Sequence, residues 1–208
     1  MICTSFHLYS LIPNGGSLIK KDQENLEQII SEEVESSKNE AINQRDVYPE
    51  KTEQNIIGQL FPEITSKALV GDVVNFPGAL EGKVTLVCIA FVRSAQNMID
   101  SWVQPFERKF GKDSRFAIYE IPMINKAWKI VSWVIDSGMR SGIPVEKHGN
   151  VVTYYGDYSG YQKILGMEDT NLAYVFLLDQ KGIIRWKGQG YSRPETEREL
   201  FETAEILI

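Results

Sequence analysis

Cysteine is almost missing from this chain, which has two in 208 residues, Cys3 and Cys88. One lies near the amino terminus and the other lies inside an apolar run, so a framework of disulfide bonds is not expected. The chain has no Cys-x-x-Cys pair, which excludes dithiol redox chemistry at such a motif. This cysteine usage favours a reducing compartment.

Long apolar runs and an excess of basic residues are also missing. No stretch approaches the roughly 18 apolar residues that a membrane-spanning helix needs. The formal net charge is -6, and no stripe of Lys and Arg could neutralise phosphates, so a nucleic-acid partner is not expected. Residues 1–17 lack the basic start and long apolar middle of a secretory signal. Because no acidic residue precedes Asp22, an import presequence stays open as an alternative.

The negative charge is concentrated near the amino terminus. Residues 22–53 hold ten acidic and three basic residues, a local charge of -7, so residues 1–60 are predicted to be an acidic extension and linker. Apolar residues between Leu26 and Val34 have the spacing of one amphipathic helix. The extension is therefore either a poorly ordered tail or a helix that docks on a partner.

An apolar run at Val84–Phe91 is the clearest element that the sequence does contain. Its length and its β-branched residues predict a buried strand. A helix follows directly, because apolar residues recur at steps of three and four on one face. These residues are Ala95, Met98, Ile99, Trp102, Val103, Phe106 and Phe110. Pro105 lies inside the pattern and is expected to kink the helix near its third turn.

Strands and helices are predicted to follow one another up to the carboxyl terminus. Strands are expected at Arg115–Ile121, Val151–Tyr155, Ala173–Leu178 and Ile183–Lys187, and helices at residues 127–139, at residues 158–165 and after Ser192. Pro122 is expected to end the first of these strands, and residues 179–182 read as a hairpin turn. Ser192 is the expected N-cap of the last helix, with Glu195 as its capping-box partner and Pro194 in the first turn.

This order of elements predicts an α/β fold, a thioredoxin-like mixed sheet flanked by helices, over residues 61–208. In redox members of that fold the turn after the first buried strand carries Cys-x-x-Cys or one reactive Cys, because the helix dipole stabilises a thiolate there. In this chain the turn, residues 92–97, is without a CxxC motif and holds no cysteine. Leu172-Ala173 also stands where redox relatives place a cis-proline before the penultimate strand.

Two sequence blocks carry a resemblance to a known family. They are SWVQPFE at Ser101–Glu107 and DQKGIIRWKGQG at Asp179–Gly190. Together with shorter matches between Phe76 and Leu200, their order and spacing resemble the mitochondrial ATP synthase assembly factors called ATP-ten, a thioredoxin-like family. The family-motif positions are Ser101, Pro105, Phe106, Pro144, His148, Asp157, Asn171, Tyr174 and Asp179.

The resemblance implies a non-catalytic assembly factor or chaperone of the F-type ATP synthase membrane sector, which binds the newly made proton-channel subunit. It implies no enzyme activity, no cofactor and no metal. It also implies a peripheral location at the mitochondrial inner membrane, on the matrix side, or a cytoplasmic location if the chain is prokaryotic.

Five residues in the two blocks are candidates for partner binding. They are Trp102, Arg185, Trp186, Gly188 and Gly190. Arg and Trp are frequent in binding hot spots, but each candidate also has a structural interpretation. Trp102 fits the core, Arg185 fits an ion pair with Asp179 or Asp157, and the glycines fit a turn with positive φ. Arg185 and Trp186 are adjacent on one strand, so their side chains are expected on opposite faces.

Two other functions stay open. A divergent thioredoxin-like or peroxiredoxin-like redox protein would use Cys88, but a thiol inside a buried strand is shielded and its pKa is expected to rise. A thioredoxin-like interaction module with another client is the second alternative. His148 is one of two histidines and has no second ligand nearby, so a metal site is not expected.

Overall fold

The computed structural model describes residues 56–208. Most of the predicted extension, including its helix at residues 26–34 and Cys3, lies outside the described residues. The strands are β1 (Ile64–Ala68), β2 (Val73–Phe76), β3 (Val84–Ala90), β4 (Phe116–Asn125), β5 (Val152–Gly156), β6 (Tyr174–Leu178) and β7 (Ile184–Gln189). The α-helices are α2 (Gln96–Phe110), α3 (Ser132–Gly142), α4 (Ser159–Leu165) and α5 (Pro194–Ile206). Short 3₁₀ segments are η1 (Gly78–Leu80), η2 (Arg93–Ala95), η3 (Lys126–Val131) and η4 (Val145–Asn150).

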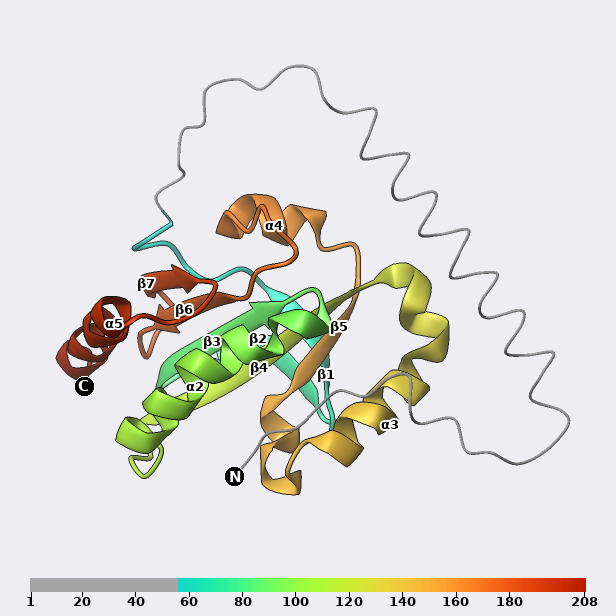
Figure 1. Cartoon of the computed structure of the whole chain (residues 1–208), viewed down its shortest axis with the longest axis horizontal. Coiled ribbons are helices and arrows are strands. Elements are labelled where there is room, and N and C mark those ends of the chain that lie inside the picture. Colours follow the sequence, from blue (N-terminus) through green and yellow to red (C-terminus); the bar gives the residue numbers. More distant parts are fainter. Residues whose placement is uncertain (1–55) are drawn as a thin grey trace, which may run out of the picture. The chain divides into compact units, whose positions relative to one another are not determined.

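These strands form one mixed sheet in the order β2-β1-β5-β4-β3-β6-β7 (Figure 1). β3, β4 and β5 are parallel neighbours. The hairpin β1–β2 joins β5 antiparallel, and the hairpin β6–β7 joins β3 antiparallel. The segment at residues 64–76 is therefore a hairpin that widens the sheet.

Helices cover both faces of the sheet, so its central strands are buried on two sides. On one face α2 and α5 pack against β3, β4 and β6, with Leu86 and Trp102 in this core. On the other face α4 and η1 close a second core that contains Val87 and Leu165. α3 lies with η4 beside β5, as Figure 1 shows for the helix, and Ile135 belongs to a third, smaller cluster there.

The predicted buried strand is confirmed as β3. Its residues Val84–Ile89 all have 0% exposure. Successive side chains alternate between the two cores, because Leu86 and Cys88 face α2 and α5 while Val87 faces the opposite core. Every position on this strand is thus a packing position.

The predicted long helix is confirmed as α2, which contains Pro105 in its interior. Phe106 has 0% exposure and is the centre of an aromatic cluster. Its ring centroid lies 4.8 Å from that of Phe110, 5.9 Å from that of Phe116 and 6.4 Å from that of Phe201. Tilted and edge-to-face pairs of this kind favour a fixed relative position of their elements. They hold α2 to β4 and α5.

The expectation that Pro122 ends the fourth strand is wrong. β4 continues through it to Asn125. On one side β4 pairs with β3 up to the register position Ala90–Pro122, and on the other side it pairs with β5 from Met123 onward. Pro122 lacks an N–H, and it is accommodated because it lies where one ladder ends and the other begins.

Two helix starts also differ from expectation. The helix predicted from residue 127 begins as the 3₁₀ segment η3, and α3 follows. The Asn125 side chain caps η3 and accepts a hydrogen bond from Ala127 N at 3.1 Å. The last helix has its N-cap at Arg193 and not at Ser192. Thr196 Oγ1, not Glu195, accepts from Arg193 N at 3.1 Å. Ser192 is engaged elsewhere, as described below.

Residues just before β1 are attached to the sheet. Ile56 has 5% exposure. Gly58 N donates to Ile184 O at 2.8 Å, and Ile184 N donates to Gln59 O at 2.9 Å, so this segment lies along the start of β7. Within residues 56–208, no helix has both the length and the hydropathy that a bilayer crossing requires.

Candidate functional site

The turn between β3 and α2 lies where redox members of this fold carry their thiol. It passes through Val92 and η2 into Gln96, the first residue of α2. Arg93, Ser94 and Asn97 are its exposed residues, so the turn presents a guanidinium, a hydroxyl and an amide and no sulfur. The bond between Leu172 and Ala173 is trans, because the one cis peptide among the described residues joins Phe76 and Pro77.

Cys88, the residue that a redox function would need, is sealed inside the sheet. It has 0% exposure and faces the core under α2 and α5. Burial raises the pKa of the Cys88 thiol well above its ordinary value, and the negative charges of Glu120 and Asp100 raise it further. A neutral, shielded thiol packs as a small apolar side chain and is a poor nucleophile.

A carboxylate network lies beside this thiol. Glu120 is the register partner of Cys88 in the parallel pair β3–β4. Gln96 Nε2 donates to Glu120 Oε2 at 3.3 Å and to Asp100 Oδ1 at 3.0 Å, which links the first turn of α2 to the strand. Burial raises the pKa of Glu120, and the neighbouring Asp100 adds to the rise. Sequence reasoning missed Glu120, although its alternation with Phe116 and Ile118 could have placed it on the α2 face of β4.

The two motif blocks meet in space, through residues that are 88 and 91 positions apart in the sequence. Trp102 Nε1 donates to Gly190 O at 2.8 Å. Ser192 N donates to Ser101 Oγ at 2.9 Å, and Ser192 Oγ donates to Ser101 O at 2.8 Å. We call these three hydrogen bonds the α2–β7 clamp. The clamp fixes the loop between β7 and α5 to the middle of α2.

Two indole rings complete the clamp. Trp102 has 1% exposure. Its ring lies edge-on to that of Trp186, with centroids 5.3 Å apart at 63°. A Cβ at Gly188 would lie 2.3 Å from Trp186 Cη2 and 3.2 Å from Trp102 Cη2, so glycine leaves room for the rings. Gly190 has φ 67°, the positive value expected for a glycine turn.

Arg185 forms an ion pair with Asp179, one of the two partners expected. Its Nη2 and Nε atoms lie 2.6 Å and 2.8 Å from Asp179 Oδ2. Asp179 Oδ1 accepts from the backbone N of Lys181 and Ile183 at 2.8 Å and 3.0 Å. Burial alone would raise the pKa of Asp179, but the hydrogen bonds from Ile183, Arg185 and Lys181 outweigh it and lower the pKa. The carboxylate therefore fixes the β6–β7 turn.

Strand β7 is irregular at Arg185, so simple alternation does not describe Arg185 and Trp186. The pairing of β6 with β7 shifts by one residue at Leu178, so Arg185 is the extra residue of a bulge. Trp186 then packs against the α2 core. The side chain of Arg185 is 42% exposed. Arg185 is the one exposed residue among the five partner-binding candidates.

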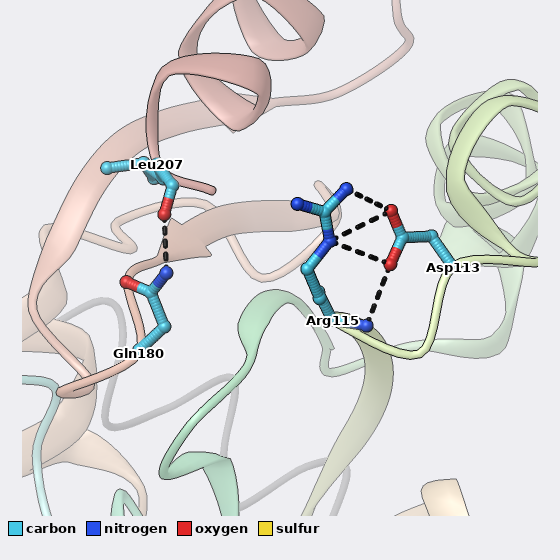
Figure 2. A network of polar contacts seen from close by, with 4 residues as sticks. All are labelled: Asp113, Arg115, Gln180 and Leu207. Atoms are coloured by element: carbon cyan, nitrogen blue, oxygen red, sulfur yellow. Dashed lines mark hydrogen bonds and ion pairs between the residues drawn. The ribbon is translucent and has the colours of Figure 1, made fainter.

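Further polar contacts lie in the loop before β4 and at the β6–β7 turn (Figure 2). The side-chain hydrogen bonds of Arg115 lower the pKa of Asp113 to about 2. Gln180 Nε2 donates to Leu207 O at 2.5 Å, which ties the β6–β7 turn to the end of α5. The Asp113–Arg115 contact lies within one loop, and neither contact involves the turn after β3.

The motif residues near α4 have local structural roles. The hydroxyl of Tyr174 accepts from Asp169 N at 2.8 Å and donates to Asp169 O at 3.1 Å. Asn171 N and Nδ2 donate to Asp169 Oδ1 at 2.8 Å and 2.9 Å. Asp157 Oδ1 accepts from Ser159 N at 2.9 Å, at the start of α4. These bonds hold the two ends of the segment that carries α4.

The motif residues near η4 are likewise local. Pro144 is exposed and caps η4. His148 has 8% exposure, and its Nε2 lies 2.8 Å from Ile143 O. No group of three or more His, Cys, Asp or Glu residues that could hold a metal ion occurs in the described part of the chain.

Comparison with known proteins identifies both a family and a fold. The family model described as ATP10 protein matches residues 57–206. Among solved structures, the thioredoxin domain of a thiol-disulfide oxidoreductase from Bacteroides vulgatus is 19% identical, with a TM-score of 0.53 over 73% of this chain and 98% of that one. A SCO1/SenC family lipoprotein from Bacillus anthracis is 14% identical, with a TM-score of 0.51 over 74% and 98%. These likenesses confirm the thioredoxin-like fold. The curated proteins gave no match.

The space under the two indole rings gives a first prediction. Gly188→Ala should destabilise the fold by about 1–3 kcal/mol, because the added methyl group overpacks Trp186 and Trp102. Urea unfolding measures this as a lower midpoint. Gly160→Ala is the matched control, since nothing lies within 4 Å of its added Cβ in α4 and its stability should be unchanged or higher. Equal midpoints for the two variants would contradict the close packing.

The ion pair of the β6–β7 turn gives a pH prediction. Asp179→Asn keeps an oxygen for the backbone donors and loses the charge that pairs with Arg185, so it should cost about 1 kcal/mol, since solvent reaches the guanidinium. The folded-state pKa of Asp179 is lowered below its usual 3.8. The stability difference between wild type and variant should therefore be full above about pH 4 and shrink as the pH falls through the lowered pKa. A difference that does not change with pH in chemical unfolding would contradict this.

Proposed function

Because the chain belongs to the ATP10 protein family, we propose that it is a non-catalytic assembly factor of the F-type ATP synthase. It binds the newly made proton-channel subunit of the membrane sector and holds it before assembly. The observation that carries this proposal is the family match, since it extends over nearly all of the described domain.

The chemistry of the turn after β3 supports a binding function without catalysis. The exposed residues of this turn offer no sulfur, and the thiol of Cys88 is buried with a raised pKa. A redox protein that used Cys88 would need peroxide or a disulfide to reach a side chain with 0% exposure. This burial disfavours the alternative of a divergent thioredoxin or peroxiredoxin.

The β6–β7 hairpin is the surface that we assign to the client. Trp102, Gly188 and Gly190 are occupied with the clamp, so among the candidates Arg185, together with the outer part of Trp186, remains accessible. Arginine combines a long apolar stem with five donors, which suits contact with a client. The protein acts peripherally at the inner membrane, on the matrix side in an organelle or on the cytoplasmic side in a prokaryote.

Photo-crosslinking in native membranes tests the proposal. A photoreactive residue in place of the exposed Lys181, in the β6–β7 turn, should crosslink to an ATP synthase membrane-sector subunit. The same residue in place of the exposed Lys163, on α4, is the control and should give less of this product. Crosslinks from Lys163 alone would reject the hairpin surface. If neither position recovers a synthase subunit, the assembly function is contradicted.

Substitution and chemical labelling of Cys88 distinguish this function from the redox alternative. With Cys3→Ser as background, Cys88→Ala should leave client crosslinking unchanged, because the thiol only fills space. Neither protein should consume peroxide or reduce a disulfide, and a thiol reagent should label Cys88 only after unfolding. Turnover that the background protein shows and the Cys88→Ala variant loses would establish a redox function.

A further inference from the structure

A groove lies between α2, η4 and the start of β4, on the face of the sheet that α2 covers. Its volume is about 270 Å³. The apolar part of its wall is made by Val103, Phe106, Phe110, Phe116, Ile118 and Val151. Three carboxylates, one ammonium group and one amide complete it, from Glu107, Glu120, Glu146, Lys147 and Asn150. None of these polar residues belongs to the hairpin surface or the clamp.

The size of the groove restricts its ligand. An apolar cavity of about 150 Å³ holds a benzene molecule, and drug-sized ligands need about 300–1,000 Å³. A space of about 270 Å³ therefore suits one long side chain.

The charge of the groove restricts the ligand further. Lys147 Nζ is paired with Glu107 Oε2 at 2.8 Å, so the one ammonium group of the wall is already neutralised. Asn150 Nδ2 is committed to Ile118 O at 2.7 Å. The carboxylates of Glu120 and Glu146 are left in excess, and a cation is the complementary ligand.

A cation that enters the groove would meet the carboxylate of Glu120 at the buried end of the groove. Its carboxylate receives one hydrogen bond within residues 56–208, from Gln96 Nε2 at 3.3 Å. An ionised carboxylate has about four acceptor positions, so it has capacity for a charged donor. In a partly desolvated site such a charge-assisted bond is stronger than a neutral one.

We propose that this groove binds a lysine or arginine side chain of a partner polypeptide, with the alkyl stem on the apolar wall and the cation on Glu120. Long basic side chains have this division between apolar stem and charged head. The inference rests on the proposed function as far as the partner is a protein client. It adds the chemistry of one contact, at a site separate from the hairpin.

Binding of a cation in this groove depends on pH. Glu120 is faced by Asp100 and Glu107 from α2, by Lys147 from η4 and by the thiol of Cys88 from β3. Burial and Asp100 raise the pKa of Glu120, while Gln96 and Lys147 oppose the rise. Since only the ionised carboxylate attracts the cation, affinity falls as the pH falls through this raised pKa.

The test uses the full chain and two small probes, n-butylguanidinium and its neutral isostere n-butylurea, with binding followed by NMR chemical shifts. We expect n-butylguanidinium to bind about tenfold tighter than n-butylurea, with shifts at amides of α2 and η4. Glu120→Gln should remove this preference and leave n-butylurea binding unchanged. Lys147→Met, which frees Glu107, should strengthen n-butylguanidinium binding.

The control is Glu202→Gln, an exposed site on α5, which should change neither affinity. Equal binding of the two probes, no binding, or a preference that survives Glu120→Gln would each overturn the inference. If the probe preference holds and crosslinking recovers no synthase subunit, the groove chemistry stands and the assembly function fails. If crosslinking succeeds and the probe preference is absent, the assembly function stands and the inference about the groove fails.

Discussion

The burial of β3 on both faces is the constraint on which the rest of the structure depends. All side chains of Val84–Ile89 are shut off from water, and fully burying each large apolar one contributes roughly 1.5–3 kcal/mol. On such a strand a cysteine contributes the volume of its side chain to packing. Ionising its thiol would be unfavourable, because burial disfavours the charged form. The fold thus keeps the strand, turn and helix of a redox protein, while the thiol at Cys88 is a packing group.

The two sequence blocks that carry the family resemblance contact each other in the structure, where the loop after β7 packs on α2. SWVQPFE supplies Ser101, Trp102 and the aromatic centre Phe106. The second block supplies the Asp179–Arg185 pair, Gly188 against the indole rings and the Gly190 carbonyl that accepts from Trp102. A motif conspicuous in sequence can therefore mark where distant elements lock together. The two surfaces that we propose for partners are the accessible rim of the hairpin and the acidic groove beside η4, which differ in charge and lie on different elements.

Local sequence pattern predicted β3 from its length and β-branched residues, α2 from its apolar period, and the hairpin β6–β7 from its turn residues. It could not show that residues 64–76 add two strands beside β5, since pairing between strands is a long-range choice that no local pattern contains. Pro122 and Ser192 were misread for a related reason: local preference assigned a strand end and a helix cap, and tertiary contacts overrode both. The groove around Glu120 is assembled from three elements and has no local signature.

The clamp has a consequence for how the protein is made. Its bonds join residues 88 and 91 positions apart, so α2 has no partner for the Trp102 indole until the ribosome has added the second block. At roughly 5–20 residues per second that delay is on the order of 5–18 s. During this delay the apolar face of α2 is not yet covered by the β7–α5 loop and α5. Contacts between residues so far apart in sequence are also slow to form. A nascent chain therefore leaves this face of α2 incompletely covered until its carboxyl-terminal residues have been made.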